Sequence, residues 1–566
     1  MSWIEQTDEF FRSLRLWDLK LDEAYLNFTL PAEANEIFLY GLAAECDKCP
    51  FTKLAKVTSN ASVVTIDTAE RMEFKIFTGN RGKYVFDNVT DFVCHEKPSL
   101  GEFGVYDVNV REDGCSFETA LEPVKPVLSL IVVTLIIIAF AFLYKLSIKG
   151  YRLLSTPDES SRDTELNLTA PQKPRLKSLD TFRGIAIVIM IFVNSGGGGF
   201  RWIEHATWNG LHIADLVFPW FIWIMGACIP MSVRSALNRN VSRTGIFLNV
   251  LRRSVTLFCI GVCLNSINGP LLQDLRFFGV LQRFGVAYLV VTGLQAVFMN
   301  PTPVQPQNPV KRALFDVFLL TPQYLVSAGI VIFYLCLVFF LPVPGCERGY
   351  FGPGGKHDYF SNPACIGGVT GYIDRLVLGL SHIYQHPTAK KVFESSAFDP
   401  EGVFGCLPTI IQTIFGAQAG MILLYHAEAA ARLKRWLSWG LILGLISGIL
   451  CGFSKNDGVI PINKNLWSLS FVLATSGLAF FLLAACFYLI DVKKWWTDEW
   501  NPFLYPGQNA IIMYVGHTIM HKMLPWHWRV TYMNTHFIRL LENSWNTVLW
   551  VLIAIYLYNK NIFYSV

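Results

Sequence analysis

The sequence predicts an all-α membrane fold: a polytopic bundle of about eleven transmembrane helices with a small β-rich N-terminal domain. Composition predicts this first, because the 566-residue chain is 52% hydrophobic and only 16% charged, whereas soluble domains average about 25% charged residues. The second observation is that the apolar residues gather into runs approaching the roughly 20 residues that cross a bilayer. The net charge of +4 is small, and no basic tail indicates a nucleic-acid partner.

Residues 1–123 precede the first apolar run and are expected to form the β-rich domain, because 62–66 and 72–77 have strand composition and partial alternation. Sequons and cysteines together favour an oxidising, lumenal compartment for this domain. The sequons are at Asn27, Asn60 and Asn88, and the cysteines are Cys46, Cys49, Cys94 and Cys115. Two disulfides are expected, with their connectivity open. A zinc half-site at Cys46 and Cys49 is the alternative, but no second Cys or His pair has suitable spacing.

The first span is expected within residues 124–145, with its apolar run at about 127–144. The linker that follows, 146–178, is polar and rich in lysine and arginine. Basic residues concentrate in cytosolic loops. The linker is therefore expected in the cytosol and the N-terminal domain in the lumen.

Residues 179–566 are expected to form a ten-helix transmembrane domain. Its spans are expected at about 180–195, 213–232, 245–264, 279–299, 319–341, 407–426, 436–453, 466–490, 503–521 and 543–559. Alternation then places most of the remaining basic residues, and the C-terminus, in the cytosol. Residues 342–406 become a long lumenal loop. In it Cys346 and Cys365 are the natural disulfide pair, whereas Cys406 either bonds to the N-terminal domain or stays free.

A polar, glycine-rich connector separates two of these spans. It begins at Asn194, contains His205, and ends at Asp215. Ionisable groups at a membrane edge are functional candidates. His205 could act as a general base or carry an acyl group, Asn194 could stabilise an oxyanion, and Asp215 could orient the imidazole. The residue types are equally compatible with an ordinary loop histidine in a flexible turn.

Basic residues also cluster at the expected cytosolic ends of the helices. Arg183, next to Asp180, could form with other arginines a basic mouth for an anionic cytosolic ligand. The other members would be Arg234, Arg252 and Arg253. Ordinary positive-inside topology explains the same arginines, and on sequence alone it is the favoured interpretation.

Several polar residues at the lumenal ends of spans are candidates for ligand binding. Gln282 and Arg283 begin one span, and buried Arg normally pairs or faces a cavity. His517 is interpreted as a hydrogen-bonded membrane histidine near the expected ligand cavity. The pairs His382/His386 and His517/His521 have zinc-compatible spacing, but neither has the glutamate of an HExxH motif, so no metal site is expected.

The blocks around these residues resemble one known family. They include LDTFRG at 179–184, HATWNG at 205–210 and ADLVFPW at 214–220. Further blocks are 279–283, 371–375, 384–387, 399–402, 461–468 and 514–517. In order and content they are similar to the heparan-α-glucosaminide N-acetyltransferases, and the resemblance covers the membrane region from about residue 175 onward.

That resemblance implies a glycosylated lysosomal membrane enzyme. It would transfer acetyl from cytosolic acetyl-CoA to the terminal non-reducing glucosamine of heparan sulfate in the lumen, without a metal. His205 would be the active-site residue and Asn194 its helper. The basic mouth would bind acetyl-CoA, and the acceptor would meet Arg283, Gln282, Asn209, Trp208 and His517. The family is also associated with eleven spans and homodimers.

Two mechanisms and two rival functions stay open. His205 could form an acetyl-imidazole, or it could deprotonate the glucosamine ammonium in a ternary complex. The second is preferred, because acetyl-imidazole would hydrolyse in a water-filled lumen. A secondary transporter also has glycine-broken helices and protonatable residues, and a non-catalytic receptor could use the glycosylated domain. Neither rival explains the block-by-block resemblance.

Overall fold

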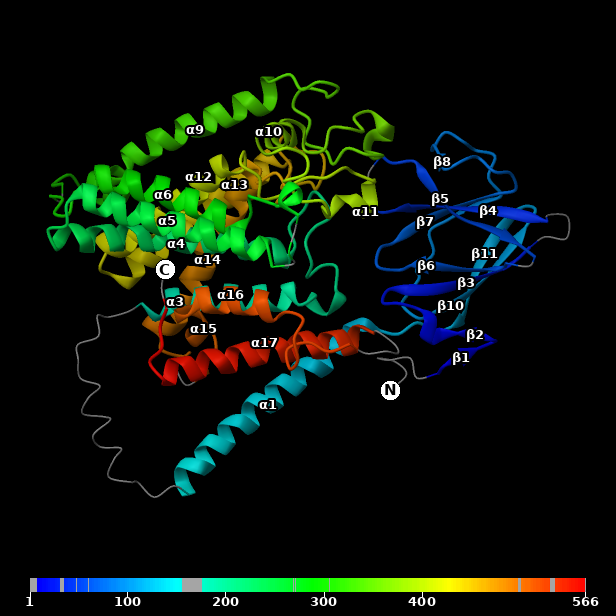
Figure 1. Ribbon diagram of the computed structural model, residues 1–566, viewed down its shortest axis with the longest axis horizontal. Coiled ribbons are helices and arrows are strands. Elements are labelled where there is room, and N and C mark those ends of the chain that lie inside the picture. The colour runs from blue at the N-terminus through cyan, green and yellow to red at the C-terminus, as the bar shows by residue number, and fades with distance from the viewer. Residues whose placement is uncertain are drawn as a thin grey trace.

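The computed structural model describes residues 8–30, 35–46, 48–59, 61–154, 176–267, 269, 271–304, 306–496, 500–529 and 535–564. All strands assigned in these ranges lie between Phe10 and Leu121, and the longer helices follow them. The β-rich part lies beside one end of the helical part (Figure 1). The described chain is therefore mostly helical, with its β sheets at the N-terminus, as the predicted fold class requires.

The N-terminal segment is built from two facing sheets and a short β1–β2 hairpin. One sheet has the order β11-β10-β3-β6 and the other β8-β5-β4-β7-β9. Leu26, Leu39, Phe74 and Val108 come from both sheets and share one core. The strand bounds are Phe10–Phe11, Leu14–Arg15, Glu23–Thr29, Glu36–Ala43, Phe51–Thr58, Val63–Asp67, Met72–Phe77, Tyr84–Val85, Cys94–Glu96, Val105–Arg111 and Gly114–Leu121 for β1 to β11.

Disulfides cross-link this segment and the long loop. Cys94–Cys115 joins β9 to β11 and thus one sheet to the other, while Cys46–Cys49 closes the turn after β4. In the loop, Cys346 is bonded to Cys365. Cys406 is a buried free thiol at the start of α12, so the structure contains no bond from it to the N-terminal segment.

The sequons differ in their surroundings. Asn88 lies exposed between β8 and β9. Asn27 is partly buried on β3, and its Nδ2 donates to Asp107 Oδ1 at 2.9 Å. Asn60 lies outside the described residues.

The principal helices are numbered along the chain. Their bounds are α1 Pro126–Leu154, α3 Lys177–Asn194, α4 Ile213–Asn238, α5 Arg243–Asn265, α6 Val280–Phe298, α9 Thr321–Phe340, α10 Gly368–Leu378, α12 Cys406–Tyr425, α13 Ala429–Leu450, α14 Leu469–Phe487, α15 Leu504–Gln508, α16 Ala510–Met520 and α17 His536–Asn559. Short helices are α7 Pro309–Ala313, α8 Phe315–Leu319 and α11 Ala389–Phe393, and the 3₁₀ turn η2 spans Gly197–Gly199.

Within the described ranges, nine helices are long and apolar enough to cross a membrane. The other two expected spans correspond to α3, which has 18 residues including Lys177, Asp180 and Arg183, and to the stretch 503–521. That stretch is two helices, α15 and α16, rather than the single expected helix. Its chain breaks at Asn509, after a proline and a glycine, where Gly507 lies against the Asp180 carbonyl of α3.

Close helix contacts form the centre of the bundle. A Cβ on Gly226 of α4 would lie 2.1 Å from Thr413 O, and one on Gly416 of α12 would lie 2.0 Å from Trp223 O. Only glycine permits this approach, the usual role of small residues between membrane helices. In contrast, α1 is mostly exposed and reaches the bundle at α17, where Val133 packs near Leu540.

The β sheets dock on the side of the bundle where the connector 195–212 and the loop 342–406 lie. Lys83 pairs with Glu394 at 2.6 Å and Lys391 with Asp67 at 2.6 Å. The Cys46–Cys49 disulfide packs in one cluster with Trp208 and with residues of the loop. Since α3 ends at Asn194 on this side, Arg183 near its start lies toward the opposite side.

Candidate active site

His205 and Asp215 form a hydrogen-bonded pair at the start of α4. His205 Nδ1 lies 2.7 Å from Asp215 Oδ1. Asp215 is buried, and its Oδ2 accepts hydrogen bonds from the backbone N–H groups of Ala206 and His212. Because this carboxylate already accepts two N–H groups, Nδ1 of His205 donates to it. Nε2 is then left as the basic nitrogen of a side chain that is 36% exposed.

A second histidine holds Asn194 at the C-terminal end of α3. His517 Nδ1 donates to the Met513 carbonyl at 2.9 Å, since a carbonyl can only accept. Its Nε2 is therefore an acceptor and receives Asn194 Nδ2 at 3.0 Å. An amide nitrogen carries two hydrogens, so Asn194 keeps a second N–H for another acceptor.

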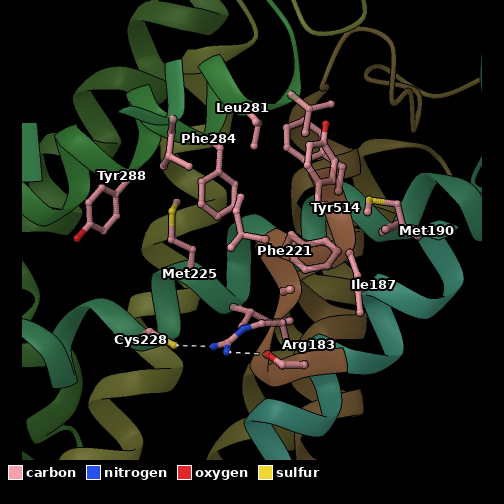
Figure 2. Close-up of a pocket in the computed structure, with 18 of the residues that line it drawn as sticks. Arg183, Ile187, Met190, Phe221, Met225, Cys228, Leu281, Phe284, Tyr288 and Tyr514 are labelled. Atoms are coloured by element: carbon pink, nitrogen blue, oxygen red, sulfur yellow. Dashed lines mark hydrogen bonds between the residues drawn. The ribbon is translucent and has the colours of Figure 1, made fainter. Parts of the chain in front are cut away.

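One cavity of about 370 Å³ joins both ends of α3. Its lining includes Asn194 and His205 at one end and Arg183 at the other. At about 1.5 Å of rise per residue, Arg183 and Asn194 lie about 16 Å apart along the helix axis. Between them the wall is largely apolar. Figure 2 shows Ile187, Met190, Phe221, Phe284 and Met225 around the cavity, with Arg183 below them.

The Arg183 end of the cavity is basic, and Arg183 is held there by two side chains and one backbone carbonyl. Arg183 donates to Asp180 Oδ1 and to the Gly507 carbonyl, both at 3.2 Å, and to Cys228 Sγ at 3.4 Å. Arg253 also lines the cavity, with its guanidinium 4.8 Å from the Tyr288 ring centroid. Of the other expected mouth residues, Arg234 lies over Tyr425 and Arg252 is exposed, and neither lines the cavity.

The His205 end of the cavity carries charges of both signs. Glu401 and Lys464 line it, with Lys464 Nζ 3.5 Å from the carboxylate. Arg276 bonds Glu401 at 2.7 Å and Asp399 at 2.5 and 2.8 Å. Burial alone would raise the pKa of Glu401, but the surrounding cations outweigh burial and lower it to about 2. Glu401 is therefore an anion.

Comparison with known proteins shows which family this chain belongs to. A family model described as "Heparan-alpha-glucosaminide N-acetyltransferase, catalytic" matches residues 175–304. The heparan-alpha-glucosaminide N-acetyltransferase of Homo sapiens is 41% identical over 598 residues, covering 97% of this chain and 89% of the human protein. The Mus musculus protein of that name is 37% identical over 603 residues, with the same coverage. The chain belongs to the heparan-alpha-glucosaminide N-acetyltransferase family. It is an acetyltransferase.

The matched segment of this acetyltransferase contains the residues that the sequence singled out. Asn194, His205, Asp215, Arg183 and Arg253 all lie within 175–304, and all but Asp215 line the cavity. Asp215 reaches it through His205. The structure thus places residues from both ends of α3 around one cavity.

The expected acceptor-binding residues do not line this cavity. Gln282 and Arg283 are buried, with Arg283 donating to the Gly402 carbonyl at 2.7 Å and Gln282 to that of Phe258 at 3.3 Å. Trp208 donates to the Phe351 carbonyl at 2.8 Å. Asn209 is bonded to Asn456 and Asn463. None of the four, nor His517, lines the cavity.

Sequence reasoning missed Glu401 and His212. Glu401 was visible only as part of a matching block, whereas the sequence offers Lys464, with other loop bases, as a candidate for binding a sulfated or carboxylated lumenal ligand. His212 lies in the connector but points its Nδ1 toward the Glu204 carbonyl at 3.1 Å and caps α4. The only sequence signal for the Glu401–Lys464 pair was that both lie in polar blocks directly before apolar runs.

Proposed function

We propose that this protein acetylates the terminal non-reducing glucosamine of heparan sulfate, using acetyl-CoA from the opposite side of a lysosomal membrane. One observation carries the proposal: a single cavity reaches from Arg183 to His205 along α3. The β-rich segment and the disulfide-bonded loop would face the lumen, and Arg183 would face the cytosol. A homodimer in the bilayer is proposed from the family alone.

The donor end suits coenzyme A. Arg183 and Arg253 would pair with its phosphates, which guanidinium groups bind well. The pantetheine arm is long, thin and mostly apolar, so it would lie along the wall formed by Ile187, Phe221 and Phe284. This would bring the thioester toward Asn194.

The acceptor end suits an amino sugar with acidic neighbours. The anionic Glu401 would attract the glucosamine ammonium, while Lys464 would meet a sulfate or uronate. Both charges lie in the same cavity wall as His205. A neutral sugar would form no ion pair with either of them.

We propose that His205 acts as a general base in a ternary complex. Its Nε2 takes a proton from the ammonium, and the amine attacks the thioester carbonyl. The free N–H of Asn194 stabilises the oxyanion, which collapses to expel the coenzyme A thiolate. The protonated His205 gives its proton to the thiolate, and the neutral Nε2 then takes the second proton from the amine nitrogen and passes it to solvent, so one proton is released per turnover. Asp215 holds the required tautomer throughout.

The test uses purified protein in liposomes, with acetyl-CoA outside and glucosamine inside. N-acetylglucosamine is expected inside with the native protein and is lost with His205→Ala. The matched control is His212→Ala, which changes a connector histidine outside the cavity and keeps product formation. No internal product, or equal product with His205→Ala, would overturn the proposal. Acetyl trapped on His205 from acetyl-CoA alone would replace the ternary mechanism with an acetyl-imidazole one.

A further inference from the structure

Two carboxylates and an imidazole meet where the β sheets contact the helical bundle, apart from the cavity. Asp22 lies in the turn before β3, Glu102 in the turn before β10, and His536 is the first residue of α17. One ligand atom from each lies within 4.8 Å of the other two. None of the three lines the cavity already described.

The hydrogen bonds of His536 fix which nitrogen faces the carboxylates. Its Nδ1 is 2.9 Å from the Gly198 carbonyl, which can only accept, so Nδ1 carries the hydrogen. Its Nε2 is 2.9 Å from Asp22 Oδ1 and 3.7 Å from Glu102 Oε2. In neutral His536 this nitrogen presents a lone pair to two anions. The arrangement therefore requires a cation between them, either a proton or a metal ion.

Glu102 adds a second buried carboxylate to the cluster. Its side chain is only 2% exposed, its oxygens have no hydrogen-bond partner of good geometry among the described residues, and the donors that approach it are the backbone N–H groups of Asp22 and His536. Burying a carboxylate with so little compensation is costly. With a proton on Nε2 and both carboxylates ionised, the three groups together keep one net negative charge. A divalent ion bound to neutral His536 and both carboxylates brings their sum to zero.

The types of ligand in the cluster also suit a divalent metal ion. A metal-binding histidine commonly donates its other N–H to a backbone carbonyl, as His536 does to Gly198. One imidazole and two carboxylates suit zinc, and to a lesser degree manganese. We propose that Asp22, Glu102 and His536 bind one divalent transition-metal ion, with zinc as the first candidate.

Such an ion would be a structural clamp. It would tie two turns of the β sheets to α17 and, through Gly198, to the turn that follows Asn194. Asn543 of α17 holds the same turn, accepting from Gly198 N at 2.8 Å and donating to Ser195 O at 2.7 Å. The site would thus support the connector without taking part in acetyl transfer.

The test measures zinc on the full-length protein purified in detergent. After incubation with zinc chloride and gel filtration in metal-free buffer, elemental analysis is expected to find roughly one zinc ion per chain. Glu102→Gln and His536→Gln should lose it. The matched control is His95→Gln, because His95 also pairs with a carboxylate on the β sheets but outside the cluster, 3.3 Å from Glu73. This variant should keep the ion.

The melting temperature shows whether a variant that loses zinc is still folded. Zinc should raise the melting temperature of the native protein and of His95→Gln, and should leave that of folded Glu102→Gln unchanged. The experiment is repeated with manganese chloride. Failure of the native protein to retain either ion, or equal retention by Glu102→Gln, would overturn the proposal and leave a proton as the shared cation.

Discussion

At the residue scale, hydrogen bonds around the cavity determine which polar atoms can donate a hydrogen bond and which can accept one. Asp215 determines that Nε2 of His205 is basic, and His517 determines that an N–H of Asn194 stays free. These hydrogen bonds leave Nε2 of His205 able to accept a proton and an N–H of Asn194 able to donate a hydrogen bond. Arg183 is likewise held by Asp180 and Gly507 rather than left to sample solvent.

Asp215→Asn is expected to lower kcat roughly 10²- to 10⁴-fold with little change in KM for acetyl-CoA. The amide can donate to Nδ1, which favours the tautomer with its hydrogen on Nε2 and removes the base. Steady-state kinetics check this, and the melting temperature shows whether the variant is folded. An unchanged kcat in a folded Asp215→Asn protein would contradict an orienting role.

Arg183→Gln and Arg253→Gln are each expected to raise KM for acetyl-CoA by roughly ten- to a hundred-fold, since each removes a charge-assisted contact. KM for glucosamine should change little, because both arginines lie at the other end of the cavity. Arg252→Gln is the matched control, as its side chain is exposed and outside the cavity. Equal effects of all three substitutions on KM would argue for general positive charge instead of a defined donor site.

At the element scale, α10 and the loop around it carry a titrating group that links pH to stability. Asp374 of α10 is buried, and its Oδ1 accepts from Phe404 N at 2.9 Å. No described residue hydrogen-bonds its Oδ2. Burial, as the main cause, raises the pKa of Asp374 to about 7. The folded loop therefore favours the protonated carboxyl.

The protein is expected to become less stable as pH rises from about 4 to about 7. The folded state binds a proton at Asp374 in this range and the unfolded state does not, so raising the pH favours unfolding by up to about 4 kcal/mol. Melting temperatures in detergent at pH 5 and pH 7 measure the effect. In Asp374→Asn this contribution disappears, so the melting temperatures at pH 5 and pH 7 should lie closer together. An unchanged difference between them would contradict the assignment of the raised pKa to Asp374.

At the scale of the whole molecule, the β sheets, the connector and the long loop share one side of the bundle, and Arg183 lies toward the other. The orientation proposed here puts the first side in the lumen. Asn88 is exposed on that side, whereas Asn240, which begins an Asn-Val-Ser sequon, is exposed just beyond the end of α4, at the opposite side. These two sequons therefore report which side faces the lumen.

Asn88→Gln is expected to lower the apparent mass of the protein made in animal cells by one glycan, because glycans are added only in the lumen. Asn240→Gln should leave the mass unchanged. Gel mobility before and after glycosidase treatment measures both. A glycan on Asn240 would reverse the proposed orientation.

The sequence by itself determined where most helices lie and which connector carries candidate functional residues. Nine expected spans became long apolar helices, because partition of a helix into a bilayer depends on the local run of residues. The cost of polar groups beside a bilayer singled out His205 and Asn194 for the same local reason.

Only the tertiary structure decided which distant residues meet. Beside the break at Asn509, Gly507 packs against α3, and Glu401 and Lys464 line the same cavity as His205 from separate loops. Asp22 and His536 meet across a separation of 514 residues. Hydropathy and spacing describe neighbours along the chain, whereas these contacts follow from how helices, sheets and loops pack, so no local pattern contains them.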